Sequence, residues 1–250
     1  MGALLRYGLL FKLASVFSLL LVWHLLALAV SRPALPVPAE AFAVFWQQLP
    51  AGLGKHFLVS AWRVLASIFL SLLVGVPLGL FLGAEKKLDL FFAPVIYLTY
   101  PLPKIAFLPV VMFFFGLGDS AKIFLIALVV FFQVLVTTRD AARNVSQALV
   151  LSVVSLGAGK LDIYRHVIWP AAVPEIFTAL RIGSGTAIAV LFFAESFASS
   201  DGLGYYLVEA WSRYMYGEMF AGIIALGFLG YFLYVCLDLL DRKVCAWKRM

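Results

Sequence analysis

Residues 155–181, SLGAGKLDIYRHVIWPAAVPEIFTALR, interrupt an otherwise apolar chain with charges, a Gly-Ala turn and paired prolines. On both sides of this segment the chain is strongly apolar. Of its 250 residues, 64% are hydrophobic and 13% are charged, and the mean hydropathy is +1.03. A soluble domain is about half apolar and about a quarter charged. The sequence therefore predicts an all-α, multi-pass membrane protein in which residues 155–181 form a water-exposed loop.

Six stretches are long enough to cross a bilayer. A hydrocarbon core of about 30 Å needs roughly 20 apolar residues at a helical rise of about 1.5 Å per residue. The expected spans are Leu9–Val30, Phe57–Gly83, Leu90–Leu117, Ala121–Val136, Ile176–Phe197 and Phe220–Leu240. The first run is too long for a cleavable signal peptide and no small-x-small cleavage site follows it, so we expect it to remain as an anchor.

The distribution of basic residues favours a topology with both termini in the cytoplasm. In that topology the cytoplasmic basic residues are Arg6, Lys12, Lys86, Lys87, Arg139, Arg143, Lys160, Arg165, Arg181, Arg242, Lys243, Lys248 and Arg249. The others are Arg32, Lys55, Arg63, Lys104, Lys122 and Arg213. This positive-inside bias accounts for the net charge of +6. No basic run is long enough to follow a phosphate backbone, so we expect no nucleic-acid partner.

Two smaller features flank the spans. Arg32 to His56 carries four prolines around AEAFAVFWQQL, which favours an extracytoplasmic hairpin with an interfacial helix bearing aromatic residues rather than a ligand site. Cys236 and Cys245 lie toward the cytoplasmic end of the last span, where thiols stay reduced, and no histidine is nearby. We expect them to be packing residues.

The second span carries Gly75, Gly79 and Gly83 at intervals of four residues. This spacing places all three on one helix face, where another backbone can approach closely. The pattern predicts a helix-packing face without identifying the partner helix.

The third span is expected to be broken. It would be roughly 42 Å long as one helix, and Pro101, Pro103 and Pro109 interrupt it. Irregular backbone at membrane depth is tolerated only where protein or a wet cavity surrounds it. The segment from Tyr100 to Lys104, YPLPK, is therefore a candidate pathway lining or hinge.

Other polar residues within the spans are further pathway candidates. Lys104 and Glu195 face either a bundle interior or the two interfacial regions, and the sequence favours neither alternative. Gln133 is better suited to an interhelical hydrogen bond than to contact with a solute. The fifth span begins with many small residues, including Ser184 and Thr186, which suit pathway lining and packing equally well.

Residues 144–156, NVSQALVLSVVSL, form an amphipathic helical pattern. One half of the helical wheel holds Asn144, Gln147, Ser152 and Ser155, and the other holds Val145, Leu149, Val153 and Leu156. Leu151 and Val154 project from the polar half, which suggests insertion into another protein.

The segment after this helix contains turn residues, charges and prolines. We expect Gly157 and Gly159 to end the helix through permissive φ angles. The charged residues that keep the next turn in water are Lys160, Asp162, Arg165 and His166. Pro170 and Pro174 are expected to break the return path.

Together these residues resemble the EAA loop of ABC-importer permeases. The loop matches are Leu156-Gly157-Ala158, residues 167–176 (VIWPAAVPEI) and Leu180-Arg181. Further matches are TYPLPKIAFLPVVMFFFGLGDSAKI, AES followed by GLGY at 202–205, and Trp247 after basic residues. The combination is similar to the nitrate, sulfonate, taurine and bicarbonate permease family.

The resemblance implies a type I importer (MetI-like) fold with a cytoplasmic coupling helix, in a bacterial inner membrane. It implies a single permease domain, 1–250, with a peripheral part, 1–56, and a transport core, 57–242, whose coupling loop is about 141–175. It also implies two ATPase subunits, a second permease copy, usually identical, and a periplasmic binding protein. The positions implied to couple to the ATPase are Leu151, Val154, Ser155, Leu156, Gly157, Ala158, Gly159, Lys160, Tyr164 and Arg165.

One departure from the family concerns the Glu-Ala-Ala motif. Leu151, Ser152, Val153 and Val154 occupy its positions and the residue after it, so we expect docking to depend on apolar burial more than on salt bridges. A degenerate subunit paired with a different permease is an alternative.

The chain lacks the residues of an enzyme. No phosphate-binding G-x-x-x-x-G-K-[ST] motif occurs, so ATP and Mg²⁺ are assigned to the partner ATPase. His24, His56 and His166 form no ligand cluster, and we assign neither a metal nor catalytic residues. The resemblance implies import of a small anion, such as an alkanesulfonate, nitrate or bicarbonate. The alternatives are a gradient-driven transporter or channel and, last, a membrane-embedded enzyme, for which the ionisable groups are too sparse.

Overall fold

The computed structural model describes residues 2–249, and every regular element in that range is helical. Five long apolar helices could each cross a membrane, and a bent pair makes a sixth span. The long helices are α1 (Gly2–Val30), α3 (Gly54–Ala84), α6 (Asp119–Arg143), α9 (Trp169–Ser196) and α11 (Tyr216–Val244). The bent pair runs through α4 (Lys86–Thr99), η2 (Lys104–Phe107) and α5 (Leu108–Phe115), with a bend of 80°. The expected all-α membrane fold with about six spans is confirmed.

Short helices connect these spans. At one end lie α2 (Pro38–Gln48), η1 (Leu49–Leu53) and α10 (Leu203–Ser212), and at the other lie α7 (Gln147–Ser155), α8 (Lys160–Ile163) and η3 (Tyr164–Ile168). η4 (Ala246–Arg249) follows α11. Phe45 of α2 is buried, whereas 65% of the neighbouring Trp46 side chain is exposed.

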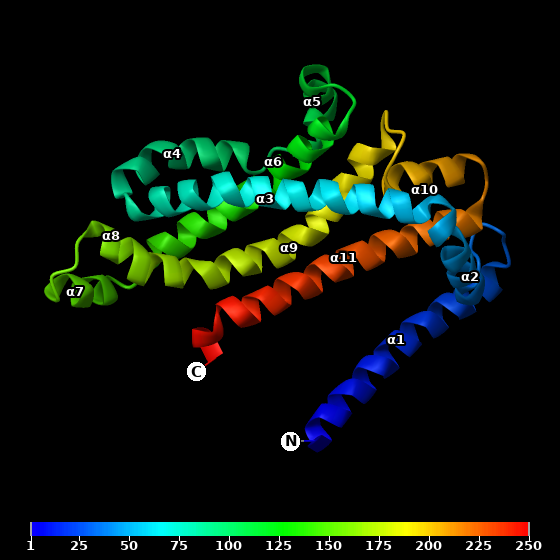
Figure 1. Ribbon diagram of the computed structural model, residues 1–250, viewed down its shortest axis with the longest axis horizontal. Coiled ribbons are helices and arrows are strands. Elements are labelled where there is room, and N and C mark those ends of the chain that lie inside the picture. Colours follow the sequence, from blue (N-terminus) through cyan, green and yellow to red (C-terminus); the bar gives the residue numbers. More distant parts are fainter. Residues whose placement is uncertain (1, 250) are drawn as a thin grey trace.

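The centre of the molecule is formed by α3, α6 and α9 lying along one another, with α11 against α9 and α10 (Figure 1). The core includes Val64 of α3, Leu125 and Val130 of α6, and Leu191 of α9, each at most 1% exposed. α4 runs back along α3, whereas α1 extends away from the bundle and meets it at α2. The indole of Trp23 secures that junction by donating a hydrogen bond to the Pro36 carbonyl at 3.1 Å.

The three glycines of α3 lie against α6. A Cβ at Gly79 would stand 2.7 Å from the Thr138 Cβ, and one at Gly83 would stand 2.3 Å from the Arg139 carbonyl oxygen. Gly75 is less crowded, since its Cβ would lie 3.2 Å from the nearest Val134 carbon. The absence of these side chains lets the two backbones approach closely.

The start of the fifth span differs from the expectation. α9 begins at Trp169 rather than Ile176, with Pro170 in its first turn and Pro174 inside it, so the prediction that these prolines break the path is wrong. A proline in the first turn removes an N–H that has no helical acceptor. The π-helical η3 ends at Ile168, just before Pro170, and alters the backbone bonding there. Inside α9, the Thr178 hydroxyl donates to the Pro174 carbonyl at 3.0 Å.

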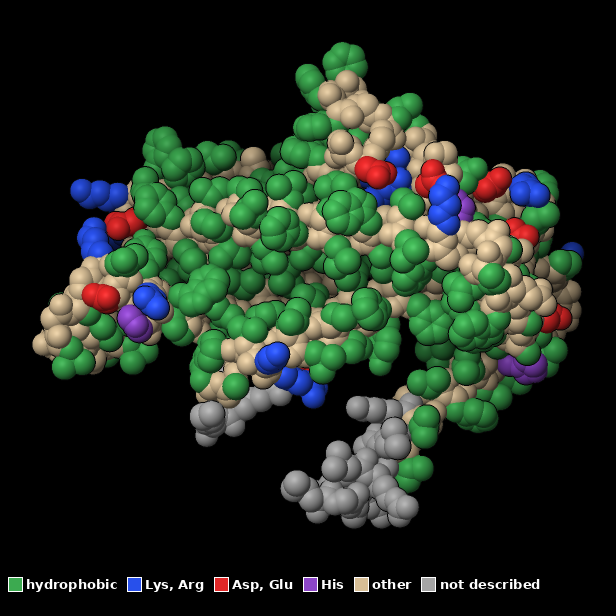
Figure 2. All heavy atoms as spheres, in the orientation of Figure 1, with side chains coloured by type: hydrophobic (Ala, Val, Ile, Leu, Met, Phe, Trp, Pro, Cys, Tyr) green, Lys and Arg blue, Asp and Glu red, His purple; other side chains and the backbone are tan. Residues whose placement is uncertain are grey.

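Most charged side chains lie toward the two ends of the elongated bundle, with a further basic group near the end of α11, and hydrophobic side chains cover most of the face between them (Figure 2). α7 and α8 mark one end, and α2 and α10 mark the other. This division is typical of a bundle that crosses a hydrocarbon layer. The side chains of Arg6, Lys12, Lys248 and Arg249 lie outside the part that the structure describes, as do Met1 and Met250.

Candidate functional site

The loop between α6 and α9 contains an apolar helix with little cover from its own chain. α7 has no buried residue. Its largest exposed apolar side chains, with the fraction exposed, are Leu149 (58%), Leu151 (59%), Val154 (45%) and, just after the helix, Leu156 (86%). Exposed apolar side chains gathered on one short helix are typical of a surface that contacts another protein.

The predicted division of this helix into a polar and an apolar half is wrong in two respects. Asn144 precedes α7, which begins at Gln147, so it is not on the helix. Leu149 of the apolar half is exposed, and Leu156 of that half follows the helix and is also exposed, so only Val150 and Val153 turn partly toward the protein. The helix lies at the tip of the molecule, where too little of the chain is present to cover it.

A glycine reverses the chain after α7. Gly157 has φ +87°, a left-handed conformation that residues with a side chain rarely adopt, and its N–H donates to the Val154 carbonyl at 2.9 Å. Gly159, expected to act in the same way, instead has φ −82° and caps α8. Its N–H donates to the Asp162 carboxylate at 3.0 Å.

The remaining loop residues divide between solvent and the body of the protein. Ser155, Lys160 and Arg165 are exposed, and Ala158 is half-buried. The half-buried Tyr164 directs its hydroxyl inward, where no described group within hydrogen-bonding distance pairs with it. Tyr164 also lines a cleft of about 330 Å³ between the loop and the ends of α3 and α6.

The broken third span carries Lys104 at its bend. The ammonium of Lys104 donates to the Tyr100 carbonyl and stands 4.5 Å from the Phe132 ring centroid and 5.2 Å from that of Tyr100. These contacts allow a cation to rest on aromatic faces. Pro101 and Pro103 are exposed beside it, so the bend forms a surface of this chain.

A polar contact joins α6 to α9 at a glycine. The Gln133 amide donates to the Thr186 hydroxyl at 3.4 Å, while its oxygen is buried without a described partner. A Cβ at Gly183 would lie 2.5 Å from that oxygen. Ser184, the next residue, is buried and donates to the Arg181 carbonyl at 2.7 Å.

Glu195 is the centre of a buried cluster at the opposite end from α7. Its side chain has no exposed surface and accepts hydrogen bonds from the Ser60 hydroxyl at 2.8 Å, the Arg63 guanidinium at 2.7 Å and the Gly204 N–H at 2.9 Å. Of the two alternatives that the sequence left open for Glu195, the bundle interior is the one that the structure has, and there the carboxylate acts as an internal anchor without exposed surface.

Arg63 connects that anchor to two further elements. Its guanidinium also donates to the Asp119 carboxylate at the start of α6 and to the Asp201 carbonyl in the loop after α9. Asp201 in turn pairs with Lys55 at 2.5 Å, and this hydrogen bond holds the pKa of Asp201 below its usual value. The sequence-based interpretation missed the roles of Ser60 and Arg63. The signal that could have found them was a lone arginine near the start of an apolar span.

Gly202 allows this cluster to close. Its φ is +112°, and a Cβ there would lie 2.3 Å from the Glu195 carboxyl carbon. In the described chain no group of three or more His, Cys, Asp or Glu residues is arranged to hold a metal ion. The cluster is therefore a set of ion pairs and backbone hydrogen bonds.

Comparisons with known proteins agree with this architecture. The family model of the binding-protein-dependent transport system inner membrane component matches residues 75–245. The taurine transport system permease protein TauC of Escherichia coli (strain K12) is 32% identical over 199 residues, covering 80% of this chain and 72% of TauC. The putative aliphatic sulfonates transport permease protein SsuC of Bacillus subtilis (strain 168) is 29% identical over 97% of this chain and 89% of SsuC.

The fold also has a solved counterpart. A chain of the MetNI methionine ABC transporter, solved in inward-facing conformations, superposes with a TM-score of 0.64 over 77% of this chain and 95% of that chain, at 19% identity. The resemblance drawn from the loop, the broken span and the AES and GLGY segments is confirmed by the family match. The chain belongs to the family of binding-protein-dependent transport system inner membrane components, and it is an ABC-importer permease subunit for a small solute.

Proposed function

We propose that this permease forms the membrane pathway for a small anion and is driven by two separate ATPase subunits that dock on α7. A second copy of the chain completes the pathway, a periplasmic binding protein delivers the solute, and both termini are cytoplasmic. ATP and Mg²⁺ bind on the ATPase. The peripheral part is 1–56 and the transport core is 57–242, with the coupling loop at about 141–175.

The observation that carries this proposal is the uncovered apolar surface of α7 and its following turn. Leu151, Val154 and Leu156 offer apolar side chains in place of charged contacts. Their burial in an apolar groove of the ATPase would lower the free energy of the complex. Burial of such a side chain is worth about 1.5–3 kcal/mol relative to exposure. The docking should therefore resist high salt, because ion pairs are screened by salt and apolar contacts are not.

Co-purification with the ATPase encoded beside this chain tests the docking. Leu151→Asp places a charge in the apolar contact and should abolish co-purification, whereas Ser152→Asp adds the same charge at the next residue and should be tolerated. Both variants need equal expression and thermal stability for the comparison. If the wild-type permease never retains an ATPase, the proposal fails and a gradient-driven transporter becomes the working model.

The anionic class of the solute is supported by Lys104 and by the relatives. Two of the relatives are named as permeases for taurine and for aliphatic sulfonates, and these solutes share a sulfonate group. Lys104 forms no ion pair with a described carboxylate and rests on aromatic rings at the bend of the third span. With Tyr100, Pro101 and Pro103 it forms the proposed lining.

A second part of the proposed lining lies where α6 meets α9, at Gln133, Ser184 and Thr186.

Uptake of labelled taurine by reconstituted transporter tests the role of Lys104. Lys104→Gln should lower uptake about tenfold, the loss expected for one charge-assisted hydrogen bond, with assembly unchanged. Lys104→Arg is the matched control that retains the charge. Wild-type uptake of a solute without a sulfonate or other anionic group, and no uptake of taurine, would contradict the assignment of an anionic group to the solute.

A further inference from the structure

Two acidic residues at the start of α4 contact the segments on either side of the exposed loop helix. Glu85 is the residue before α4, and Asp89 lies in its first turn. None of the three basic partners of these carboxylates comes from α3, the helix that α4 runs beside. The partners come from the end of α6 and from α8, the two segments that flank α7.

Asp89 forms the buried contact. It accepts a hydrogen bond from Arg139 and lies 3.3 Å from the Arg143 guanidinium. The side chains of Arg139 and Asp89 are 1% and 9% exposed, so solvent screens their attraction little. The Arg139 guanidinium also stands 5.5 Å from the ring centroid of Tyr97, two turns further along α4. Arg143 is the last residue of α6, and α7 begins four residues later.

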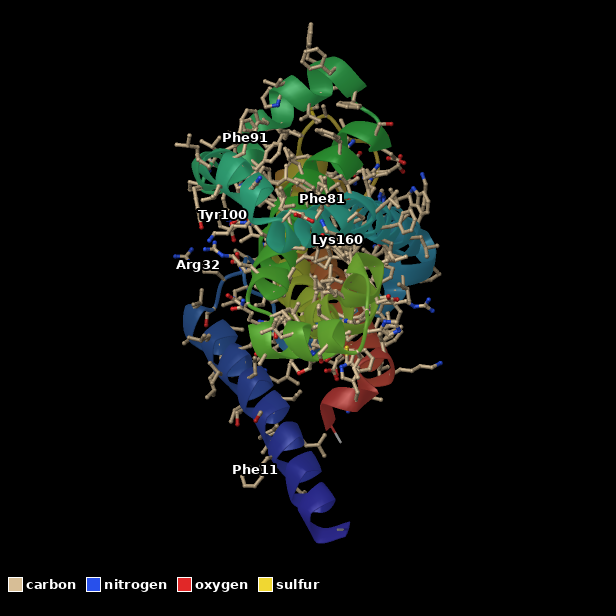
Figure 3. All side chains as sticks on the ribbon, turned by 90° about the vertical axis from the view of Figure 1, so that its left-hand side faces the viewer. Phe11, Arg32, Phe81, Phe91, Tyr100 and Lys160 are labelled. Atoms are coloured by element: carbon tan, nitrogen blue, oxygen red, sulfur yellow. The ribbon has the colours of Figure 1, made fainter. Side chains whose placement is uncertain are left out.

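Glu85 forms the exposed contact. Its carboxylate lies 3.6 Å from the ammonium of Lys160, the first residue of α8. The cleft of about 330 Å³ beside this pair is lined by residues of the α3 end, the α6 end, α7 and α8. Figure 3 looks onto this end of the molecule, where Lys160 lies close to the α3 end marked by Phe81. The corner between α3 and α4 therefore meets the loop directly.

The rest of α4 is loosely attached. Leu90, Phe91 and Leu98 are 68%, 72% and 74% exposed, and of the whole helix only Asp89 and Ile96 are buried. At its far end the helix gives way to the irregular segment before Lys104, where the span bends by 80°. By contrast, α3 is held against α6 by the close approach at Gly83. α4 is thus a weakly restrained helix with a hinge at one end.

We infer that Glu85 and Asp89 transmit movement of the coupling loop to α4, so that the ATPase drives the broken span through these two carboxylates. This inference rests on the proposed function, since it requires an ATPase docked on α7. A displacement of α7 moves Arg143 and Lys160, which flank it. The ion pairs then carry α4 with them, and the bend before Lys104 absorbs the rotation. Arg139, Arg143 and Lys160 are positioning residues in this scheme, because they act through α4 and touch no solute.

Movement is transmitted through a helix only if that helix has two arrangements and the two sites that it connects both shift the equilibrium between them. The experiment therefore measures α4 itself. In a background with Cys236→Ser and Cys245→Ser, Leu98→Cys carries a nitroxide, and the distance between the two labels of the complete transporter is measured with and without ATP and vanadate. ATP hydrolysis and ATPase co-purification are measured on the same samples. None of these readouts requires the solute to be known.

The charge swap at the exposed pair is the principal test. Lys160→Glu and Glu85→Lys each place like charges together and should reduce the ATP-dependent population shift of α4 about two- to fivefold, the range of an exposed pair. The double variant should restore it. Asp89→Asn should reduce the α4 response more than either single swap. If Asp89→Asn does not fold, Arg143→Gln serves as the second variant, because it removes one contact of Asp89 and leaves the buried Arg139 contact in place. Arg213→Gln, which breaks an exposed pair on α10, is the matched control and should respond as wild type.

The outcomes separate the inference from the proposed function. If ATP is hydrolysed by the co-purified complex and the α4 distance responds equally in wild type, the single swaps and Arg143→Gln, the inference is overturned and docking stands. If no ATPase accompanies the wild-type chain, both fail together. Loss of the α4 response in Glu85→Lys and Arg143→Gln with hydrolysis retained, and its return in the double swap, supports the inference, since a merely structural defect would not be rescued by reversing both charges.

Discussion

The two ends of the bundle use polar and apolar groups in opposite ways. At the α10 end, Glu195 is fully buried and bonded to Ser60, Arg63 and the backbone of Gly204, so that residues from α3, α9 and the start of α10 meet at one carboxylate. At the α7 end, Leu151 and other apolar side chains face solvent. One end satisfies its polar groups internally, and the other leaves apolar surface uncovered. The difference separates a fixed end from an end suited to a partner.

Removing the charge at the fixed end should have the largest effect. Glu195→Gln leaves the buried Arg63 without its buried counter-charge, and loss of one member of a buried pair costs about 3–5 kcal/mol. We expect a large fall in the thermal unfolding temperature of the purified protein. Glu209→Gln, which breaks an exposed pair with Arg213, should cost less than about 1 kcal/mol. Equal unfolding temperatures for the two variants would remove the distinction between a fixed end and an ordinary surface.

The close contact between α3 and α6, the helices that run between the two ends, should be the next most sensitive. Gly83→Ala would place a Cβ 2.3 Å from the Arg139 carbonyl oxygen, and since that atom is backbone, α3 and α6 must separate. Overpacking of this kind costs about 1–3 kcal/mol. Gly227→Ala on α11 is the control, because no atom outside its own helix lies within 4 Å of a Cβ there. The alanine at 227 should leave stability unchanged or slightly raised, given the helix preference for alanine. A loss at 227 equal to that at 83 would contradict the close-approach argument.

At the partner end, the turn after α7 offers a matched pair of glycines. Gly157→Ala forces a side chain into the left-handed region at φ +87°, a cost of about 1–2 kcal/mol, whereas Gly159→Ala has an ordinary φ of −82°. We expect the first change to weaken ATPase binding about five- to thirtyfold, the equivalent of that energy, and the second to leave it unchanged. The measurement is the affinity of the detergent-purified permease for the ATPase. Equal affinities would show that the turn does not set the orientation of α7.

The sequence predicted what depends on local pattern. Runs of apolar residues gave the spans, Pro101 and Pro103 located the break, and Gly157 located the turn. The Glu195 cluster was missed because Ser60 and Arg63 are 135 and 132 residues away along the chain, and nothing local to either predicts their meeting. Pro170 and Pro174 were misread because a long membrane helix accommodates a proline in its first turn, or inside it, without ending. The exposure of α7 was predicted only for Leu151 and Val154. The exposure of Leu149 could not be predicted, because it depends on how little of the folded chain surrounds the helix.

The smallest effect is expected where the fixed end reaches solvent, at the Lys55–Asp201 pair. Hydrogen bonding from Lys55 lowers the pKa of Asp201 below the 3.8 of the free side chain, so the folded state binds this proton less readily than the unfolded state. The stabilisation is therefore complete above about pH 5 and disappears as the pH falls through the folded pKa. Because the Lys55 and Asp201 side chains are 70% and 30% exposed, it should amount to at most about 1 kcal/mol. Asp201→Asn should lower the unfolding temperature slightly near neutral pH, and that difference from wild type should vanish in acid. A difference that persisted in acid would assign the loss to the Asp201 backbone contact with Arg63 instead of to the ion pair.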